Sequence, residues 1–325
     1  MTTVSRRSIV PGLGSLALLP SFAVAGRAQE QVLRIVFPFA AGGVSDGLLR
    51  HLAERLQAGL GRPVIVENKP GAGGRLGAVA VKDAPPDGST LLLAAGAQMF
   101  LQPHAFPNLG YDPFVDFVPL TQAWTFDQAL AVGMHVPART LGELAAWFKA
   151  HPDQAVYGTP GAGTGAHFAG VEFARLAKVE LRHAPYRGTP AALPDLIAGR
   201  LPAYIASAAE LNEQYKAGAI RILATLDAQR SPFRPEVPTF RESGFDIVAP
   251  AWFAFQARAQ TPKPALERLQ KAIVAVLHTS EMQEKVRALG LLPTGTTAEE
   301  AMRLQRAEYE RWGPIVKASG YRAEQ

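Results

Sequence analysis

LRIVFPFAAGGVSD, residues 33–46, joins a short apolar run to a glycine-rich loop, and an amphipathic helical pattern follows it. A second junction of this kind carries the loop Thr159-Pro160-Gly161-Ala162-Gly163-Thr164-Gly165-Ala166-His167. Glycine allows backbone amides to approach a ligand closely, and the first turn of the following helix adds unpaired donors and a positive dipole end. We therefore predict that the two junctions form opposite sides of a site for a carboxylate or phosphate.

Strand-like and helical patterns alternate outward from this stretch. Residues 33–39, 64–66 and 91–93 are apolar and rich in strand-forming residues, with helical spacing between them. A similar series begins again at residues 156–157 and continues to residues 220–226. This order predicts two α/β domains built on parallel sheets.

The last 75 residues differ from both series. One strand-like stretch at residues 252–255 precedes helical patterns, and capping-box spacing marks helix starts at Ser280 and Thr297. If these helices pack on the first domain, the chain crosses between domains twice, near residues 128–132 and 245–249, and paired crossings form a hinge. The alternative is a separate C-terminal helical subdomain.

The first 28 residues have the pattern of a signal peptide. Arg6 and Arg7 precede a mainly apolar run, and Ala23-Val24-Ala25 offers small residues for cleavage, with Ala28 as a second position. The apolar run is shorter than a membrane span and contains proline and glycine, which argues against an anchor. We expect a periplasmic protein, exported by either the Sec or the twin-arginine route.

Composition limits the classes of function that this chain can have. About 300 mature residues exceed a usual single core, and the absence of cysteine excludes disulfides and thiolate chemistry. The net charge of +5 is not gathered into a basic run with aromatic residues, so we expect no nucleic-acid partner. Neither a phosphate-binding P-loop nor an H-E-x-x-H helix occurs, and we expect no metal, no cofactor and no catalytic residues.

Several short motifs, taken in order, resemble one family. They are Phe37 to Gly43 with Asp46, Val66 to Gly74, Pro86-Asp87-Gly88, Tyr111-Asp112-Pro113, Gly163-Thr164 with His167, Pro185 to Gly188, and Val237-Pro238-Thr239. The chain resembles the substrate-binding proteins of tripartite tricarboxylate transporters, the TctC-like or Bug extracytoplasmic solute receptors. The resemblance implies a two-lobed periplasmic-binding-protein fold of type II, each lobe a largely parallel α/β sheet flanked by helices. It also implies closure on a small carboxylated solute without catalysis.

In that family, the loops after the first strand of each lobe grip a ligand carboxylate. The resemblance carries this role to Phe39, Ala41, Gly42, Gly43, Ser45 and Asp46, and to Thr159, Gly161, Gly163, Thr164, Gly165 and His167. Two of these side chains have an alternative role. Asp46 either contacts the ligand or caps the helix and complements its dipole, and His167 either donates to the ligand or holds its own loop.

A third strand-to-helix turn adds candidates from the second series. Tyr186, Arg187 and Gly188 lie where an open α/β sheet places its ligands, and Ser207 follows the next strand. The family usually has lysine where this chain has Arg187, whose guanidinium can bind a carboxylate through two hydrogen bonds. Arg187 is alternatively an exposed turn residue.

One rival function comes from a different class. Gly43-Val44-Ser45-Asp46-Gly47 matches the G-x-S-x-G elbow of α/β-hydrolases, with Asp195 or Asp227 and His278 available to complete a triad. However, Ser45 does not directly follow its strand, and little mature chain precedes it to form an oxyanion hole. We therefore treat a serine hydrolase as the alternative.

The predicted organisation is a signal peptide over residues 1–28, a first lobe over 29–130 plus 247–325, and a second lobe over 131–246. The resemblance also implies delivery of the solute to the membrane subunits of a transporter. We expect the receptor itself to be a monomer.

Overall fold

The computed structural model describes residues 1–2, 32–319 and 321 of the chain. The predicted signal peptide, residues 1–28, lies outside the described residues except for Met1 and Thr2. Residues 31–325 form a compact unit separate from residues 1–30, and the description below concerns that unit. No helix within the described ranges has the length and apolar character needed to span a membrane.

The first sheet has six strands in the order β11-β4-β10-β3-β1-β2. They are β1 (Leu33–Phe37), β2 (Val64–Asn68), β3 (Thr90–Ala95), β4 (Phe117–Phe126), β10 (Ala251–Arg258) and β11 (Leu292–Pro293). β1 pairs parallel with β2 and β3, whereas β10 pairs antiparallel with β3 and β4. Strands β1 to β4 therefore share one direction, and only β10 and β11 oppose it.

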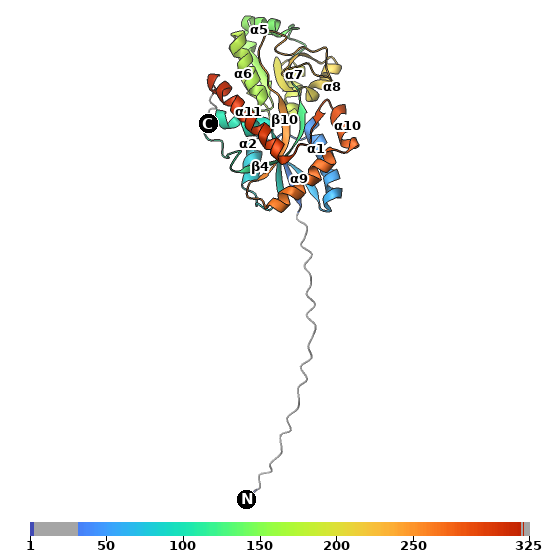
Figure 1. Ribbon diagram of the computed structural model, residues 1–325. Coiled ribbons are helices and arrows are strands. Elements are labelled where there is room, and N and C mark those ends of the chain that lie inside the picture. Colours follow the sequence, from blue (N-terminus) through green and yellow to red (C-terminus); the bar gives the residue numbers. More distant parts are fainter. Residues whose placement is uncertain (3–31, 320, 322–325) are drawn as a thin grey trace. The chain divides into compact units, whose positions relative to one another are not determined.

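Helices cover both faces of this sheet, and together they form what we call the first lobe (Figure 1). The helices are α1 (Val44–Leu60), α2 (Arg75–Lys82), α3 (Gly96–Phe100), α4 (Gln102–Ala105), α9 (Lys263–Leu277), α10 (Ser280–Ala288) and α11 (Ala298–Ala318), with a 3-10 turn at Ala72–Gly74. Ile35 packs on the face covered by α1, α9 and α10, whereas Val36 packs on the face covered by α2, α3 and α11. A strand buried on both faces explains the continuous apolar run in β1.

The second sheet has five strands in the order β7-β6-β8-β5-β9. They are β5 (Gln128–Gly133), β6 (Val156–Thr159), β7 (Arg182–Pro185), β8 (Ala203–Ser207) and β9 (Ile220–Thr225). Its helices are α5 (Leu141–Ala150), α6 (Gly165–Ala177), α7 (Thr189–Ile197) and α8 (Ala208–Lys216), with a 3-10 turn at Pro152–Gln154. Ile205 packs with α5 and α6, and Tyr204 packs with α7 and α8 on the opposite face. We call this sheet and its helices the second lobe.

The chain passes between the lobes at two places. Asp127 alone separates β4 from β5, and residues 226–250 lead from β9 back to β10. The Gln128 side chain donates to the carbonyl oxygen of Ala249 at 3.0 Å, which joins the two crossings. Because the chain leaves β4 at the end that faces the other lobe, β5 enters the second sheet from that end and runs antiparallel to β8 and β9. The prediction of two largely parallel sheets is confirmed, and β5 and β10 are the antiparallel crossing strands.

The C-terminal helices follow the predicted pattern with one correction. α11 begins as expected, because the Thr297 hydroxyl accepts a hydrogen bond from the Glu300 amide at 3.1 Å. Ser280 was the wrong cap for α10, since Thr279 supplies an equivalent hydroxyl one residue earlier and accepts from Met282. In α6, Phe173 and Ala177 are buried, whereas Leu176 is 37% exposed.

Candidate functional site

Strand ends from both lobes face one cavity of about 80 Å³. The junctions that lead into α1, α3, α6, α7 and α8 all contribute to its lining. The fold explains this convergence, because the chain leaves each parallel strand at its carboxyl end and enters the next helix there. The volume corresponds to roughly six water-sized positions, which suits one small molecule.

Polar groups at helix starts form one side of the cavity. Ser45 lies in the first turn of α1, Thr164 caps α6, and Ser207 precedes α8. First-turn amides, including those of Ser45 and Ala166, have no acceptor within their own helices. This side therefore presents donors and the positive ends of several helix dipoles.

Aromatic side chains from the first lobe line the same cavity. The rings of Phe126 and Phe253 stack with centroids 5.2 Å apart, and those of Phe100 and Trp312 stack at 6.1 Å. The complete aromatic lining is Phe37, Phe39, Phe100, Phe126, Trp252, Phe253 and Trp312. These rings give the cavity a large apolar lining, which we call the aromatic wall.

Glu210, in the first turn of α8, is the single ionisable side chain that lines this cavity within the described chain. Its Oε1 lies 2.8 Å from the place that a Cβ on Gly43 would occupy, so the carboxyl group reaches from the second lobe to the start of α1. Burial raises the pKa of Glu210, and a hydrogen bond with Thr189 opposes that effect. No lysine, arginine or histidine of the described residues joins the lining.

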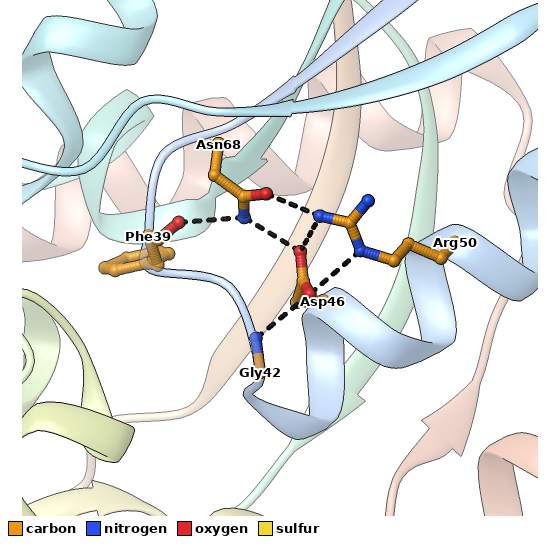
Figure 2. Close-up of polar contacts among 5 residues, drawn as sticks. All are labelled: Phe39, Gly42, Asp46, Arg50 and Asn68. Atoms are coloured by element: carbon orange, nitrogen blue, oxygen red, sulfur yellow. Dashed lines mark hydrogen bonds and ion pairs between the residues drawn. The ribbon is translucent and has the colours of Figure 1, made fainter.

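Asp46 lies in the first turn of α1, and its carboxylate binds the loop that precedes this helix (Figure 2). Its carboxylate accepts from the Gly42 amide at 3.1 Å, from Arg50 Nε at 3.1 Å and from Asn68 Nδ2 at 2.8 Å. Asn68 Nδ2 also donates to the carbonyl oxygen of Phe39 at 3.1 Å. Burial raises the pKa of Asp46, but these hydrogen bonds outweigh it and hold the pKa below its usual value. The structure thus gives Asp46 a role in the shape of the loop and the start of the helix.

His167 holds the second loop by a similar arrangement. Its Nδ1 accepts from the Gly163 amide at 3.1 Å, and its ring stacks on His183 with centroids 3.9 Å apart. Burial, with a smaller contribution from the neighbouring His183, lowers the pKa of His167 to about 3. A neutral imidazole keeps Nδ1 available as an acceptor. Of the two roles expected for His167, the structure shows the one in its own loop.

The turn after β7 is divided between two cavities. Gly188 lines the cavity described above, whereas Tyr186 and Arg187 line a neighbouring cavity of about 520 Å³. The Tyr186 hydroxyl donates to Asp195 at 2.9 Å. The carbonyl oxygen of Arg187 accepts from the Ala40 amide at 3.2 Å, and this hydrogen bond joins the two lobes.

Glycines allow the lobes to touch beside the cavity. A Cβ on Gly73 of the first lobe would clash with the carbonyl oxygen of Ala162 of the second. A Cβ on Gly163 of the second lobe would clash with the Phe106 ring of the first. The Gln102 side chain fixes the first contact by donating to the Gly73 carbonyl at 2.8 Å. Any larger residue at these glycines would hold the lobes apart.

The predicted binding residues fall into three groups. Those that line the smaller cavity are Phe39, Gly43, Ser45, Thr164, Gly165, Gly188 and Ser207. Those that line the larger cavity are Phe39, Gly161, Tyr186 and Arg187. Those outside both linings are Ala41, Gly42, Asp46, Thr159, Gly163 and His167. A loop needs internal partners to keep its shape, and several members of the third group supply them.

Glu210 and Trp312 are two of the lining residues of the smaller cavity that were not predicted. The sequence could have indicated Glu210, because it lies three residues after Ser207, in the first turn of a helix that follows a strand. Trp312 reaches the cavity from α11, nearly at the end of the chain, and no local pattern indicates that position. Phe126, Trp252 and Phe253, which lie next to the crossings between the lobes, also line the cavity.

A hydrolase triad is not assembled around Ser45. Asp195 is bonded to Tyr186, Asp227 lies beside Asp127, and His278 ends α9. Among the described residues that line the cavity with Ser45, neither of these aspartates nor His278 occurs. The G-x-S-x-G match is therefore a loop and first-turn sequence here, without the partners that an elbow serine needs.

The geometry agrees with what comparison with known proteins shows. The model for the receptors of the tripartite tricarboxylate transporter family, TctC, matches residues 48–321. This chain belongs to that family. The family expected from the sequence motifs is thereby confirmed.

Individual TctC and Bug proteins are similar over nearly their whole length. BugT of Bordetella pertussis is 30% identical over 290 residues, which cover 89% of each chain. The structure of Rpa4515 from R. palustris with adipate superposes with a TM-score of 0.83 at 28% identity, covering 89% of this chain and 97% of that one. MatC from Rhodopseudomonas palustris with bound malate superposes with a TM-score of 0.83 at 29% identity, covering 88% and 98%. The two-lobed fold of the TctC receptors is thus the fold of this chain.

Proposed function

We propose that this chain is an extracytoplasmic solute-binding protein that captures a small carboxylated organic acid between its two lobes. The observation that carries the proposal is the convergence of several helix starts on one cavity that is lined by no basic side chain of the described residues. Unpaired amides and the positive dipole ends of helices bind anions without a cationic side chain. The neighbouring structures that hold adipate and malate support the same class of ligand.

The strength of such a site is sufficient for a receptor. A hydrogen bond to a charged group contributes about 1.5 to 3 kcal/mol, so three or four of them contribute roughly 5 to 10 kcal/mol before ordering costs. Micromolar affinity requires about 8 kcal/mol. The aromatic wall adds apolar contact, which offsets part of the entropy lost on binding.

Closure follows from contacts that the ligand makes with both lobes. The crossings at Asp127 and near Ala249 act as the hinge, and a solute that touches both lobes favours the closed form. We place the first lobe at residues 29–130 plus 247–325 and the second at 131–246, although β5 joins the second sheet from Gln128. The Ala40 to Arg187 hydrogen bond is expected only in the closed form.

The role that we propose is binding and delivery rather than catalysis. The signal peptide over residues 1–28 directs the chain to the periplasm by the Sec or the twin-arginine route. There the closed receptor, a monomer, presents its solute to the membrane subunits of a tripartite tricarboxylate transporter. No cofactor or metal is required for this role.

A thermal-shift screen of the purified protein tests the proposal. Adipate, malate, benzoate and 3-phenylpropionate are compared with uncharged analogues such as hexane-1,6-diol and 3-phenylpropanol, because a ligand of the native state raises the melting temperature. We expect at least one carboxylate to raise it in a concentration-dependent manner while its uncharged analogue does not. Equal effects of the acid and its uncharged analogue, or no effect of any acid, would contradict the proposal.

A further inference from the structure

We propose that the solute is a zwitterion, an amino acid with an apolar side chain, whose ammonium group pairs with Glu210. This inference rests on the proposed function, and it adds a chemical class of ligand and a specificity-determining residue. The resemblance of the chain to carboxylate receptors does not require an acidic side chain inside the site.

The position of Glu210 is the first argument. Its carboxyl group extends from the first turn of α8 across the gap between the lobes to Gly43 at the start of α1. It therefore stands among the donors that a ligand carboxylate would use, and the Thr189 hydroxyl is its hydrogen-bond partner within the protein. A carboxyl group in this place meets any solute that the closed cavity holds.

Charge balance is the second argument. Glu210 is half-buried, and a carboxylate withdrawn from bulk water is stabilised by a cation or by several donors. No basic side chain of the described residues lines this cavity. A solute with two carboxylates would place a second negative charge near Glu210. A solute with one carboxylate and one ammonium satisfies the helix starts and Glu210 together, and it enters with no net charge.

The aromatic wall is the third argument, and it indicates the remainder of the solute. Phe126, Trp252 and Phe253 belong to the aromatic lining that the first lobe contributes to the cavity. An apolar side chain fits against these rings, since aromatic side chains offer a large apolar contact surface. The cavity of about 80 Å³ limits the solute to a small one.

Matched sets of ligands test the inference by isothermal titration calorimetry on the purified protein. One set is L-phenylalanine, L-3-phenyllactate and 3-phenylpropionate, and the other is L-leucine, its 2-hydroxy analogue and 4-methylpentanoate. The members of a set share a carboxylate and a side chain. They differ only in the group on the carbon next to the carboxylate, which is an ammonium, a hydroxyl or a hydrogen. We expect the amino acid of at least one set to bind at least 30-fold more tightly than its des-amino analogue.

Glu210→Gln separates the two ways in which this residue could act. If Glu210 pairs with an ammonium group, the substitution weakens binding of the amino acid at least 30-fold and leaves the des-amino acid within threefold or tighter. If Glu210 instead donates a proton to a ligand carboxylate, glutamine still donates, the amino acid keeps its affinity, and the inference is overturned. Glu213→Gln, at an exposed position of the same helix, is the matched control and should change neither affinity.

Failure of the inference differs from failure of the proposed function. Equal binding of the amino acid and its des-amino analogue overturns the ammonium pairing but leaves a carboxylate receptor. No binding of any acid in these sets, of adipate or of malate by the folded protein overturns both. If Glu210→Gln does not fold, the comparison of ligands on the unaltered protein still decides the question.

Discussion

The loops after β1 and after β6 keep their shape by a similar arrangement with different chemistry. In each, a glycine with positive φ donates its amide to a side chain four residues later in the following helix. The acceptor is the Asp46 carboxylate for Gly42 and the His167 imidazole for Gly163. Both acceptors had been predicted to have either a ligand-binding or a local role, and both serve the loop.

The environments of the two acceptors differ. Asp46 is charged and belongs to a network with Arg50 and Asn68. His167 is neutral and stacks on His183 in an apolar surrounding. The comparison shows that the same loop geometry can be stabilised either by an ionic network or by buried neutral rings. Only the second is sensitive to mild acid.

The largest expected effect of this difference is on stability in acid. The pKa values of His167 and His183 fall to about 3 and about 4 in the folded protein. Below pH 6.5 the unfolded chain therefore binds protons that the native chain does not, and stability decreases as the pH falls. The slope is about 1.4 kcal/mol per pH unit for each histidine. We expect a total loss of roughly 3 to 5 kcal/mol between pH 6.5 and 4.5, which is below the full value for two histidines because His183 is only partly buried.

Urea unfolding at pH 7.5, 6.5, 5.5 and 4.5 measures this loss. The first loop does not contribute in that range, because the pKa of Asp46 is lowered and its stabilisation disappears only in stronger acid. His167→Gln retains an acceptor for Gly163 and should reduce the slope. An unchanged slope in that variant would show that other groups cause the pH dependence.

A smaller effect is expected when the ionic network of the first loop is removed. Asp46→Ala removes the acceptor of the Gly42 amide and one of the two acceptors of Asn68 Nδ2, and it should lower the free energy of unfolding by about 2 kcal/mol. Asp46→Asn keeps one acceptor oxygen and should cost about half as much. Urea unfolding at pH 7.5 measures both, with Asp83→Ala at an exposed position as the control. A loss below 0.5 kcal/mol in Asp46→Ala, an estimate of ordinary surface effects, would contradict the assigned role.

The smallest effect concerns lobe closure and uses the two glycines as a matched pair. Gly42→Ala and Gly163→Ala both place a side chain at positive φ and should each cost about 1 kcal/mol of stability. A Cβ on Gly42 meets nothing within 4 Å, whereas one on Gly163 clashes with Phe106 of the other lobe. We therefore expect about a tenfold loss of affinity, roughly 1.4 kcal/mol, in Gly163→Ala and little loss in Gly42→Ala.

Calorimetry with the carboxylate that binds the unaltered protein measures that difference. Adding Phe106→Ala to Gly163→Ala removes the clashing ring and should restore part of the affinity. Equal losses in Gly42→Ala and Gly163→Ala would mean that backbone strain, and not lobe contact, controls binding.

Local patterns predicted much of the fold because they reflect local physics. The apolar run of β1, the helical spacing in α1 and the Thr297 cap each depend on neighbours within a few residues. The N-cap of α10 is Thr279 and not Ser280, because two adjacent hydroxyl residues can each fill the N-cap position and the sequence pattern does not distinguish them.

The sequence by itself determined that two glycine-rich junctions would begin helices at the ends of strands, and its motifs placed the chain in its family. Only the tertiary structure decided which junction residues face the cavity, since Asp46 and His167 are drawn into their own loops by short-range hydrogen bonds. It also brought Glu210 and Trp312 to the same site from different lobes. The reason is physical: a cavity is formed by contacts between segments far apart in the chain, and no local periodicity encodes those contacts.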